Sequence, residues 1–301
     1  MYVRQGNHCS VPDMRSRRSI LTECAKLMAF STTVSLAASA SSSLRWVAFY
    51  GLTAPEEVLA RYGLVVLDPM FGGSVVRVAQ EGARVCSYLS LGEVRMSDAV
   101  FRRIEPAALL EENPSWPGTR RIDVRHPHWA SLVIDEIIPS IAIKGFTGLL
   151  LDTLDTPAFL ESSDPAANKG MAAASVELVR TIRRAYPSMM LIVNRGYAIL
   201  EDIVDSIDMV LTESLLTRPD QTAAGLRIWN DLTDVQLQLL LLAPAHKRPR
   251  KVAILSLEYW DPQDATAIRE IYSMHRRLGH FPYVATQLLD AIIPEPALSS
   301  G

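Results

Sequence analysis

Short apolar runs alternate with longer amphipathic stretches along the chain from Trp46 onward. Each run is an almost unbroken series of β-branched or aliphatic residues, which is typical of parallel strands buried on both faces. The runs predict strands at Trp46–Tyr50, Leu64–Asp68, Arg84–Leu89, Gly148–Asp152, Met190–Asn194, Met209–Thr212, Val252–Leu255 and Tyr283–Thr286.

The stretches between these runs carry helix signals. Pro55 precedes two acids at a helix start, and helices are expected over residues 130–141, 171–185 and 264–278. The apolar run Leu237–Ala243 is interpreted as a buried helix. A strand followed by a helix, repeated eight times, predicts an α/β fold consisting of a single (β/α)8 TIM barrel. The longer connection at 94–127 is an insertion that could cover one face of it.

The first 40 residues do not follow this pattern. Five basic side chains precede the weakly apolar run Leu27–Ala40, which ends in Ala38-Ser39-Ala40. This order fits a secretory signal cleaved before Ser41, and Arg17-Arg18 resembles the pair of a bacterial twin-arginine signal. An amphipathic or disordered tail is the alternative. We expect an export signal at 1–40, the barrel at 41–301, and a periplasmic or extracellular location.

Composition and charge narrow the partners. The 301 residues are 49% hydrophobic with a net charge of -3, so the basic field that nucleic acid binding requires is missing. Removing the signal leaves 25 basic and 31 acidic side chains, a net charge of -6. Cys86 then remains alone and is expected to be a small buried hydrophobe. We expect no integral membrane segment after signal cleavage. The oligomeric state is left open.

Polar residues directly after the apolar runs are the candidates for chemistry, because barrel active sites lie at the carboxyl ends of the strands. Carboxylates dominate these positions: Asp68, Glu93, Asp152, Asp155, Glu213 and Glu258. A single acid there is often only a helix N-cap, which is a fair interpretation of Asp68. Several converging carboxylates raise one another's pKa and cost stability, so their convergence favours a function.

Two carboxyls that face each other are the minimal machinery for cleaving a glycosidic bond, one as acid and the other as nucleophile or base. Asp152 and Glu213 follow strands four and six and can face one another across the mouth of the barrel. Asp155 is either a supporting partner or the reactive group itself. Arg195 either lowers the pKa of one carboxylate or offsets buried negative charge.

Further side chains near the strand ends are expected to bind substrate. Flat aromatic faces suit the apolar face of a sugar ring. Core packing is the alternative interpretation of these aromatic residues, and for Trp46 the two interpretations are equally favoured. The group comprises Tyr50, Tyr88, Asn194, Tyr197 and Tyr259, with Trp46 and Trp260 nearby.

Other motifs are weak. His126 and His128 have a spacing that can bind metal, but no third ligand is near, so we expect a surface or packing role and no metal or cofactor. The basic run Lys247–Lys251 is interpreted as a solvated loop, with a contact to anionic polymer or lipid as the alternative.

Several strings of the sequence together resemble glycoside hydrolase family 114, the endo-α-1,4-polygalactosaminidases. The resemblance covers about Trp46 to Leu288 and rests on Tyr88–Glu93, Asn113–Trp116, Ile122–Trp129, Gly145–Asp155, Asn194–Gly196 and Thr212–Ser214. It implies a TIM-barrel hydrolase of α-1,4-linked galactosamine-rich polysaccharide, with an Asp after strand four and a Glu after strand six as the catalytic pair. These are Asp152 or Asp155, and Glu213.

An acidic mouth would attract deacetylated galactosamine, which is a cation near neutral pH, and Glu93 is placed at the ammonium or a hydroxyl of the sugar. Two hypotheses remain. The first is an exported, retaining glycosidase. The second is a barrel that binds amino-sugar polymer without cleaving it.

Overall fold

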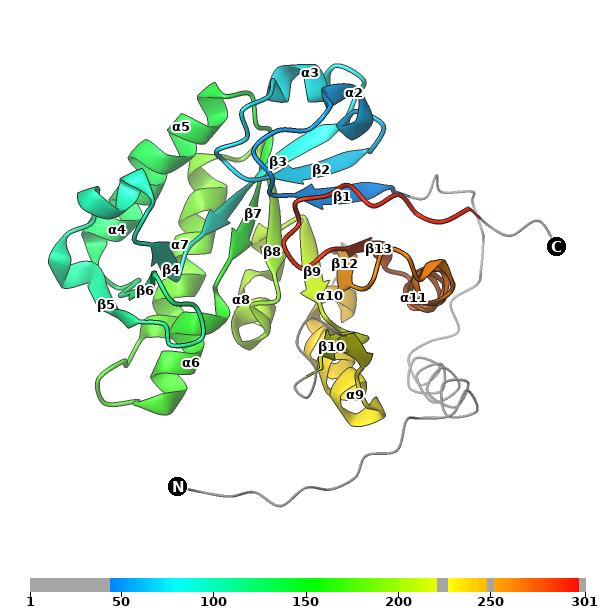
Figure 1. Cartoon of the computed structure of the whole chain (residues 1–301). Coiled ribbons are helices and arrows are strands. Elements are labelled where there is room, and N and C mark those ends of the chain that lie inside the picture. The colour runs from blue at the N-terminus through cyan, green and yellow to red at the C-terminus, as the bar shows by residue number, and fades with distance from the viewer. Residues whose placement is uncertain (1–43, 221–226, 248–251, 298–301) are drawn as a thin grey trace.

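The computed structural model describes residues 44–220, 227–247 and 252–297 (Figure 1). The predicted export signal at 1–40 lies outside the described residues, as do positions 248–251 of the basic run. The described part contains an eight-stranded, all-parallel sheet that curves into a nearly closed barrel. In sheet order its strands are β1 (Trp46–Phe49), β2 (Leu64–Leu67), β3 (Arg84–Ser90), β7 (Gly148–Asp152), β8 (Met190–Asn194), β9 (Met209–Glu213), β12 (Ala253–Tyr259) and β13 (Phe281–Ala285). The predicted TIM barrel is therefore confirmed.

The barrel closes between β1 and β13 through side chains. No backbone ladder joins these two strands among the described residues, whereas every other neighbouring pair is hydrogen-bonded. Instead, Trp46 Nε1 donates to the Phe281 carbonyl at 2.7 Å, and the Trp46 ring lies 5.6 Å from that of Tyr283. Trp46 is 1% exposed, so it packs in the core and not at the mouth.

Helices lie outside the strands (Figure 1). They are α2 (Glu56–Leu59), α3 (Val75–Ala79), α4 (Pro127–Leu132), α5 (Ile138–Ile143), α6 (Asp155–Ser163), α7 (Met171–Ala185), α8 (Leu200–Ile203), α9 (Leu232–Leu241), α10 (Ala243–Lys247) and α11 (Ala265–Arg277). A π-helical turn, Val133–Ile137, joins α4 to α5. The helices expected at 171–185 and 264–278 are present as α7 and α11, and Asp264 caps α11 by accepting from Ala267 N–H.

Two expectations about the helices were wrong. No helix follows β13 in the described residues up to 297, where the chain instead runs back along β1, and Leu289 O accepts from Tyr50 N–H. The run Leu237–Ala243 is not buried as a unit, because Leu237 and Leu240 of α9 are 56% and 64% exposed. A helix at the edge of the molecule buries only one stripe of its surface, and consecutive aliphatic residues extend around the helix beyond that stripe.

The insertion between β3 and β7 forms a small antiparallel sheet of β4 (Glu93–Arg95), β6 (Thr119–Ile122) and β5 (Leu109–Glu112) in that order. It is tied to the barrel by Trp129 of α4, whose Nε1 donates to the Leu91 carbonyl at 3.0 Å. Cys86 of β3 is fully buried, and burial raises the pKa of its thiol to about 12. The prediction of an unreactive core cysteine is therefore supported.

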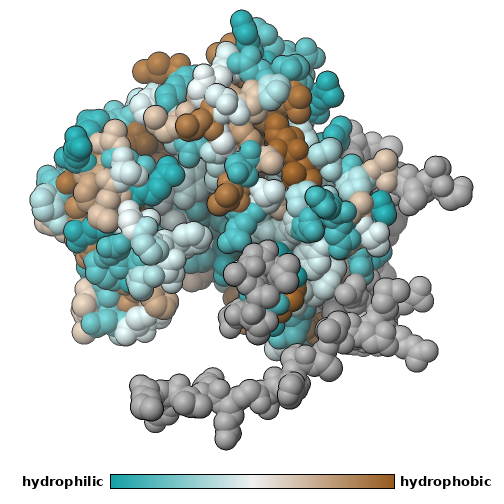
Figure 2. Space-filling model, in the orientation of Figure 1, coloured by the Kyte–Doolittle hydropathy of each residue, from teal (hydrophilic) through white to brown (hydrophobic). Residues whose placement is uncertain are grey.

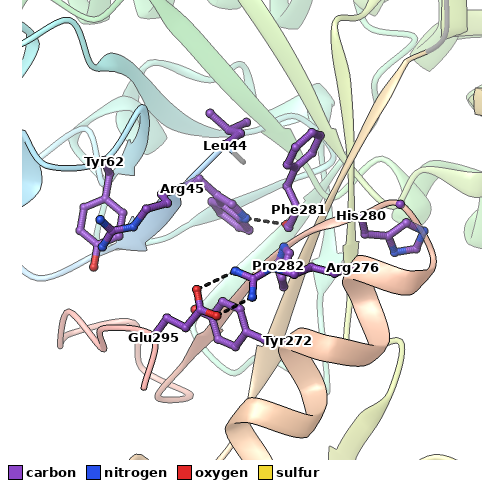
Figure 3. A pocket seen from close by; sticks show the side chains of 11 residues that line it. Leu44, Arg45, Tyr62, Tyr272, Arg276, His280, Phe281, Pro282 and Glu295 are labelled. Carbon is purple, nitrogen blue, oxygen red and sulfur yellow. Dashed lines mark hydrogen bonds and ion pairs between the residues drawn. The ribbon is translucent and has the colours of Figure 1, made fainter. Parts of the chain in front are cut away.

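A cavity of about 290 Å³ lies at the amino ends of β1 and β13, the end of the barrel opposite to the strand termini where chemistry was predicted (Figure 3). Arg276 and Glu295 form a two-pronged ion pair across it, at 2.6 and 2.7 Å. Arg45 lies over the ring of Tyr62 on its other side. None of the three candidate catalytic carboxyls, Asp152, Asp155 and Glu213, lines this cavity.

Candidate active site

The carboxyl ends of three adjacent strands bring together an acid, an amide and a second acid. Asn194, at the end of β8, donates from Nδ2 to Asp152 Oδ1 of β7 at 2.9 Å and to Glu213 Oε2 of β9 at 2.8 Å. Because both neighbours are acceptors, the amide must present its nitrogen to them. The two carboxylate oxygens therefore lie no farther apart than the two bonds laid end to end, about 5.7 Å.

Tyrosines complete the polar floor of the mouth. Tyr259, at the end of β12, donates to Glu213 Oε1 at 2.5 Å. Tyr50, which follows β1, packs its ring 5.3 Å from that of Tyr88 in β3. Burial, followed by the charge of Asp152, raises the pKa of both Tyr50 and Tyr88 well above its usual value, so both hydroxyls stay protonated as donors.

Asp152 is the strongly desolvated acid of the pair. Burial raises its pKa first, and the Glu213 charge raises it further. Hydrogen bonds from the Thr153 backbone, Asn194 and Tyr88 act in the opposite direction. Two carboxyls held this close repel one another when both are ionised.

Asp155 is not bonded to the bridging amide, although its pKa is raised by burial and also by the Glu213 charge. It begins α6, and Arg195 Nε lies 3.4 Å from its Oδ2, with both side chains nearly half exposed. Burial raises the pKa of Asp155, while Arg195 and the backbone N–H groups of Gly196 and Tyr197 lower it. Asp155 therefore ties α6 to the turn after β8, and Arg195 offsets its charge.

Glu93 and Asp68 are held mainly by protein groups. Glu93 is 5% exposed, and its Oε1 accepts from Asn113 Nδ2 at 2.9 Å and Thr156 Oγ1 at 2.6 Å. It thereby joins the inserted sheet to α6. Asp68 caps a turn, not a helix, because its Oδ1 accepts from Met70 N–H at 2.7 Å, while α3 is capped by Ser74.

The structure does not bring Glu258 to the mouth. Its side chain is fully buried behind β12, where it accepts from the backbone N–H of Leu216 and Thr217 at 2.8 and 3.0 Å. His275 of α11 lies 3.0 Å away through Nε2. Because Glu258 has no exposed surface, it cannot contact a polymer. Its position after an apolar run therefore wrongly suggested a place in the site. The run continues as strand to Tyr259, and alternate side chains of a strand point to opposite faces.

Non-glycine residues in the left-handed region follow each member of the central triplet. Thr153, Arg195 and Ser214 have φ of 62, 53 and 55°, directly after Asp152, Asn194 and Glu213. Such a conformation costs roughly 1–2 kcal/mol per residue and tends to cluster at functional sites. Local bonds hold these turns in place: Thr153 Oγ1 accepts from Gly92 N–H at 2.8 Å, and Ser214 N–H donates to Leu257 O at 2.9 Å.

Arginines also lie at the mouth, which sequence reasoning missed apart from Arg195. Arg95 of β4 contacts Asp68 at 3.5 Å and Asp98 at 3.1 Å. Arg227, at the start of β11 (Arg227–Trp229), lies 5.0 Å over the ring of Tyr259. The mouth is therefore mixed in charge and not simply acidic. No signal marked Arg227, because the hairpin of β10 (Thr217–Pro219) and β11 departs from the strand–helix repeat.

Tyr197 lines the same region, with its hydroxyl 2.9 Å from Thr212 Oγ1 and Arg195 over its ring. The Trp260 ring packs at a tilt against that of Trp229 in the hairpin strand β11, with the ring centroids 5.4 Å apart. Figure 2 shows the surface hollowed at this end of the molecule, between the side that carries α6 and the side that carries α9.

Neither a metal site nor a membrane span is found in the part of the chain that the structure describes. No group of three or more His, Cys, Asp or Glu side chains there could hold an ion. His126 and His128 both lie near Glu105, and His128 Nε2 is 2.9 Å from the Arg103 carbonyl, in line with the expected surface or packing role. None of the described helices has the length and apolar character needed to cross a bilayer.

A barrel with paired carboxyls at its strand ends defines a class, the TIM-barrel glycoside hydrolases. The sequence profile of Glycoside-hydrolase family GH114 matches residues 31–298. The chain belongs to this family, which confirms the resemblance inferred from its motifs.

Solved structures agree on the fold. The glycoside hydrolase domain of PelA from Pseudomonas aeruginosa is similar at a TM-score of 0.73 and 22% identity, over 82% of this chain and 96% of that one. Aspergillus fumigatus Ega3, in complex with galactosamine, is similar at a TM-score of 0.60 and 13% identity, over 86% and 97%.

Curated relatives match over a smaller part. An uncharacterized protein of Deinococcus radiodurans is 26% identical over 164 residues, 51% of this chain and 53% of its own length. One of Thermotoga maritima is 23% identical over 195 residues, 62% and 58% of the two lengths. The chain thus spans little more than half the length of these relatives.

Proposed function

We propose that the protein hydrolyses α-1,4-glycosidic bonds in galactosamine-rich polysaccharide by a retaining mechanism, with Asp152 as nucleophile and Glu213 as acid and base. The observation that carries the proposal is the shared amide of Asn194. It limits the distance between the nearer oxygens of the two carboxyls to about 5.7 Å. Retaining enzymes separate their carboxyls by about 5–5.5 Å, whereas inverting enzymes need about 6.5–9.5 Å to admit a water.

The reaction proceeds in two displacements. Glu213 gives its proton to the leaving glycosidic oxygen as an Asp152 oxygen bonds to the anomeric carbon, which forms a glycosyl ester and releases the first product. Glu213, now ionised, takes a proton from water. The resulting hydroxide attacks the anomeric carbon, the ester bond to Asp152 breaks, and the sugar leaves with its original configuration.

The surroundings of Asp152 suit a nucleophile. The pKa of Asp152 is raised by burial and then by the negative charge of Glu213. A proton on Glu213 removes this second cause and leaves Asp152 with donors from Thr153 N–H, Asn194 and Tyr88 to stabilise its ionised form. Asp155 has no bond to the bridging amide, and its partners are in the turn after β8. We therefore assign Asp155 to positioning that turn.

The substrate class rests on family membership and on the likeness to Ega3, whose solved structure holds galactosamine. Export to the periplasm or cell exterior fits a polymer substrate and remains a proposal, since residues 1–40 lie outside the described part. Tyr50, Tyr88, Tyr197 and Tyr259 offer the aromatic faces and hydroxyls for sugar rings.

The test is reducing-end release from partly deacetylated α-1,4-linked galactosamine polymer by wild type, D152N and E213Q. Wild type should turn over, and each variant should lose roughly 10³-fold or more in kcat, because the residues act as one unit. D155N should keep far more activity than D152N, which makes it the matched control. Undiminished turnover in D152N and E213Q would refute the assignment. Binding without turnover by wild type would support the non-catalytic alternative.

A further inference from the structure

The charge of Arg227 has no carboxylate partner among the described residues. Its Nη2 donates to Ser214 Oγ at 3.1 Å and reaches Thr217 O at 3.5 Å, and its guanidinium lies over the Tyr259 ring. The other mouth arginines differ, since Arg95 and Arg195 each contact an aspartate. The internal segments outside the described residues, 221–226 and 248–251, contain no Asp or Glu in their sequence.

An unpaired guanidinium in a half-buried position is costly unless something uses it. Burial lowers the pKa of Arg227, whereas Coulombic interactions with Glu258, Tyr259 and Glu213 raise it. Ser214 directly follows Glu213 in the chain, and the Tyr259 hydroxyl donates a hydrogen bond to Glu213. These two neighbours therefore fix Arg227 beside Glu213.

Arg227 also lies on a definite side of the carboxylate pair. Its contacts are Ser214 Oγ and the Tyr259 ring, which adjoin Glu213, whereas Asp152 takes its hydrogen bond from Asn194 on the neighbouring strand β8. In the proposed reaction Glu213 protonates the oxygen of the departing sugar, while Asp152 bonds to the sugar that stays. The arginine therefore faces the departing sugar, the one whose ring becomes the new non-reducing end.

Galactosamine units differ in their substituent at carbon 2. A free amine is a cation near neutral pH and is repelled by a guanidinium in a partly desolvated site. An acetamide is neutral, and its carbonyl oxygen accepts the charge-assisted hydrogen bond that guanidinium N–H groups donate. A guanidinium at this position therefore attracts the acetamide form and repels the free amine.

We propose that Arg227 is a specificity-determining residue that selects an N-acetylated galactosamine on the leaving-group side of the scissile bond. This rests on the proposed function and refines it: the enzyme cuts a partly deacetylated chain before acetylated units. The discrimination is expected to be about tenfold or more, since a hydrogen bond to a charged group is worth about 1.5–3 kcal/mol.

The experiment is to digest partly deacetylated α-1,4-galactosamine polymer and determine by mass spectrometry which unit forms each new non-reducing end. Wild type should show acetylated units there well above their share in the polymer. R227M and R227Q, which remove the charge, should bring that fraction down to the polymer average, and R227K should keep most of the enrichment. R277M, on the exposed part of α11, makes the same change in net charge and should behave as wild type.

End-group composition is independent of how fast a variant works or how much of it folds. Unchanged enrichment in R227M and R227Q, or an excess of free amines at the new ends in wild type, would overturn the role of Arg227 alone. No cleavage by wild type would instead refute the proposed function, and the Arg227 inference with it.

Discussion

One amide nitrogen holds two acids of like charge within a few ångströms in a desolvated site. Asn194 Nδ2 donates to both Asp152 and Glu213, and Tyr88 and Tyr259 supply a further donor to each. These donors do not offset the effects of burial and of the neighbouring Glu213 charge, because the pKa of Asp152 is still raised. The site therefore stores a destabilising charge that the reaction uses.

The first prediction concerns the stability of D152N. A folded-state pKa raised above the unfolded value means that ionised Asp152 destabilises the fold at neutral pH, and that the penalty disappears as pH falls through the raised pKa. D152N should therefore melt higher at neutral pH, by about 2–4 °C for each kcal/mol relieved, while losing activity. The gain should shrink in acid.

Thermal melts from pH 7 to pH 4 provide the measurement. Asp261, an exposed aspartate whose Oδ1 accepts from Gln263 N–H, gives the control, because asparagine can make the same turn bond. D261N should shift little at any pH. A D152N melting temperature below that of wild type at neutral pH would contradict the account.

At the scale of elements, the ends of β7, β8 and β9 share one design. Each strand ends in a site residue and turns at once through a left-handed non-glycine residue, at Thr153, Arg195 and Ser214. The tight turn keeps the preceding side chain on the rigid strand, aimed at the mouth. Strand β12 supports the same end from both faces: Tyr259 reaches Glu213, and Glu258 holds the backbone that follows it.

This arrangement predicts that Glu258 contributes to stability and not to substrate contact. E258Q replaces a buried acceptor of bonds from Leu216, Thr217 and His275 and should cost about 3 kcal/mol or more, measured by denaturant unfolding. E295Q breaks a partly exposed ion pair with Arg276 and should cost about 1 kcal/mol or less. Equal losses in the two variants would refute the buried role.

For the whole molecule, the sequence was most informative where strands are buried on both faces. Each apolar run became a barrel strand, and their polar ends Asp152, Asn194 and Glu213 met as the parallel arrangement requires. The hydrophobic periodicity could not reveal that Glu258 points outward, because the direction of its side chain depends on where β12 ends. It also could not reveal Arg227, which reaches the mouth from a hairpin whose place follows from tertiary packing.

The separation of the two carboxyls also lay beyond the sequence. The strand-end position favoured Asp152, while Asp155 also stands in the family motif, and the sequence left the choice open. The amide that bonds Asp152 and Glu213 is seen only in three dimensions. The lack of a helix after β13 in the described residues up to 297 has a similar origin, because this segment instead packs along β1 at the barrel seam.

The central claim is that Asp152 and Glu213 are close enough for a covalent, retaining reaction. It is tested most directly by proton NMR of the reducing ends newly formed by wild type, recorded before they mutarotate. The account predicts that the new reducing end appears first as the α-anomer, the configuration of the bond that was cut. First appearance of the β-anomer would show inversion and contradict it.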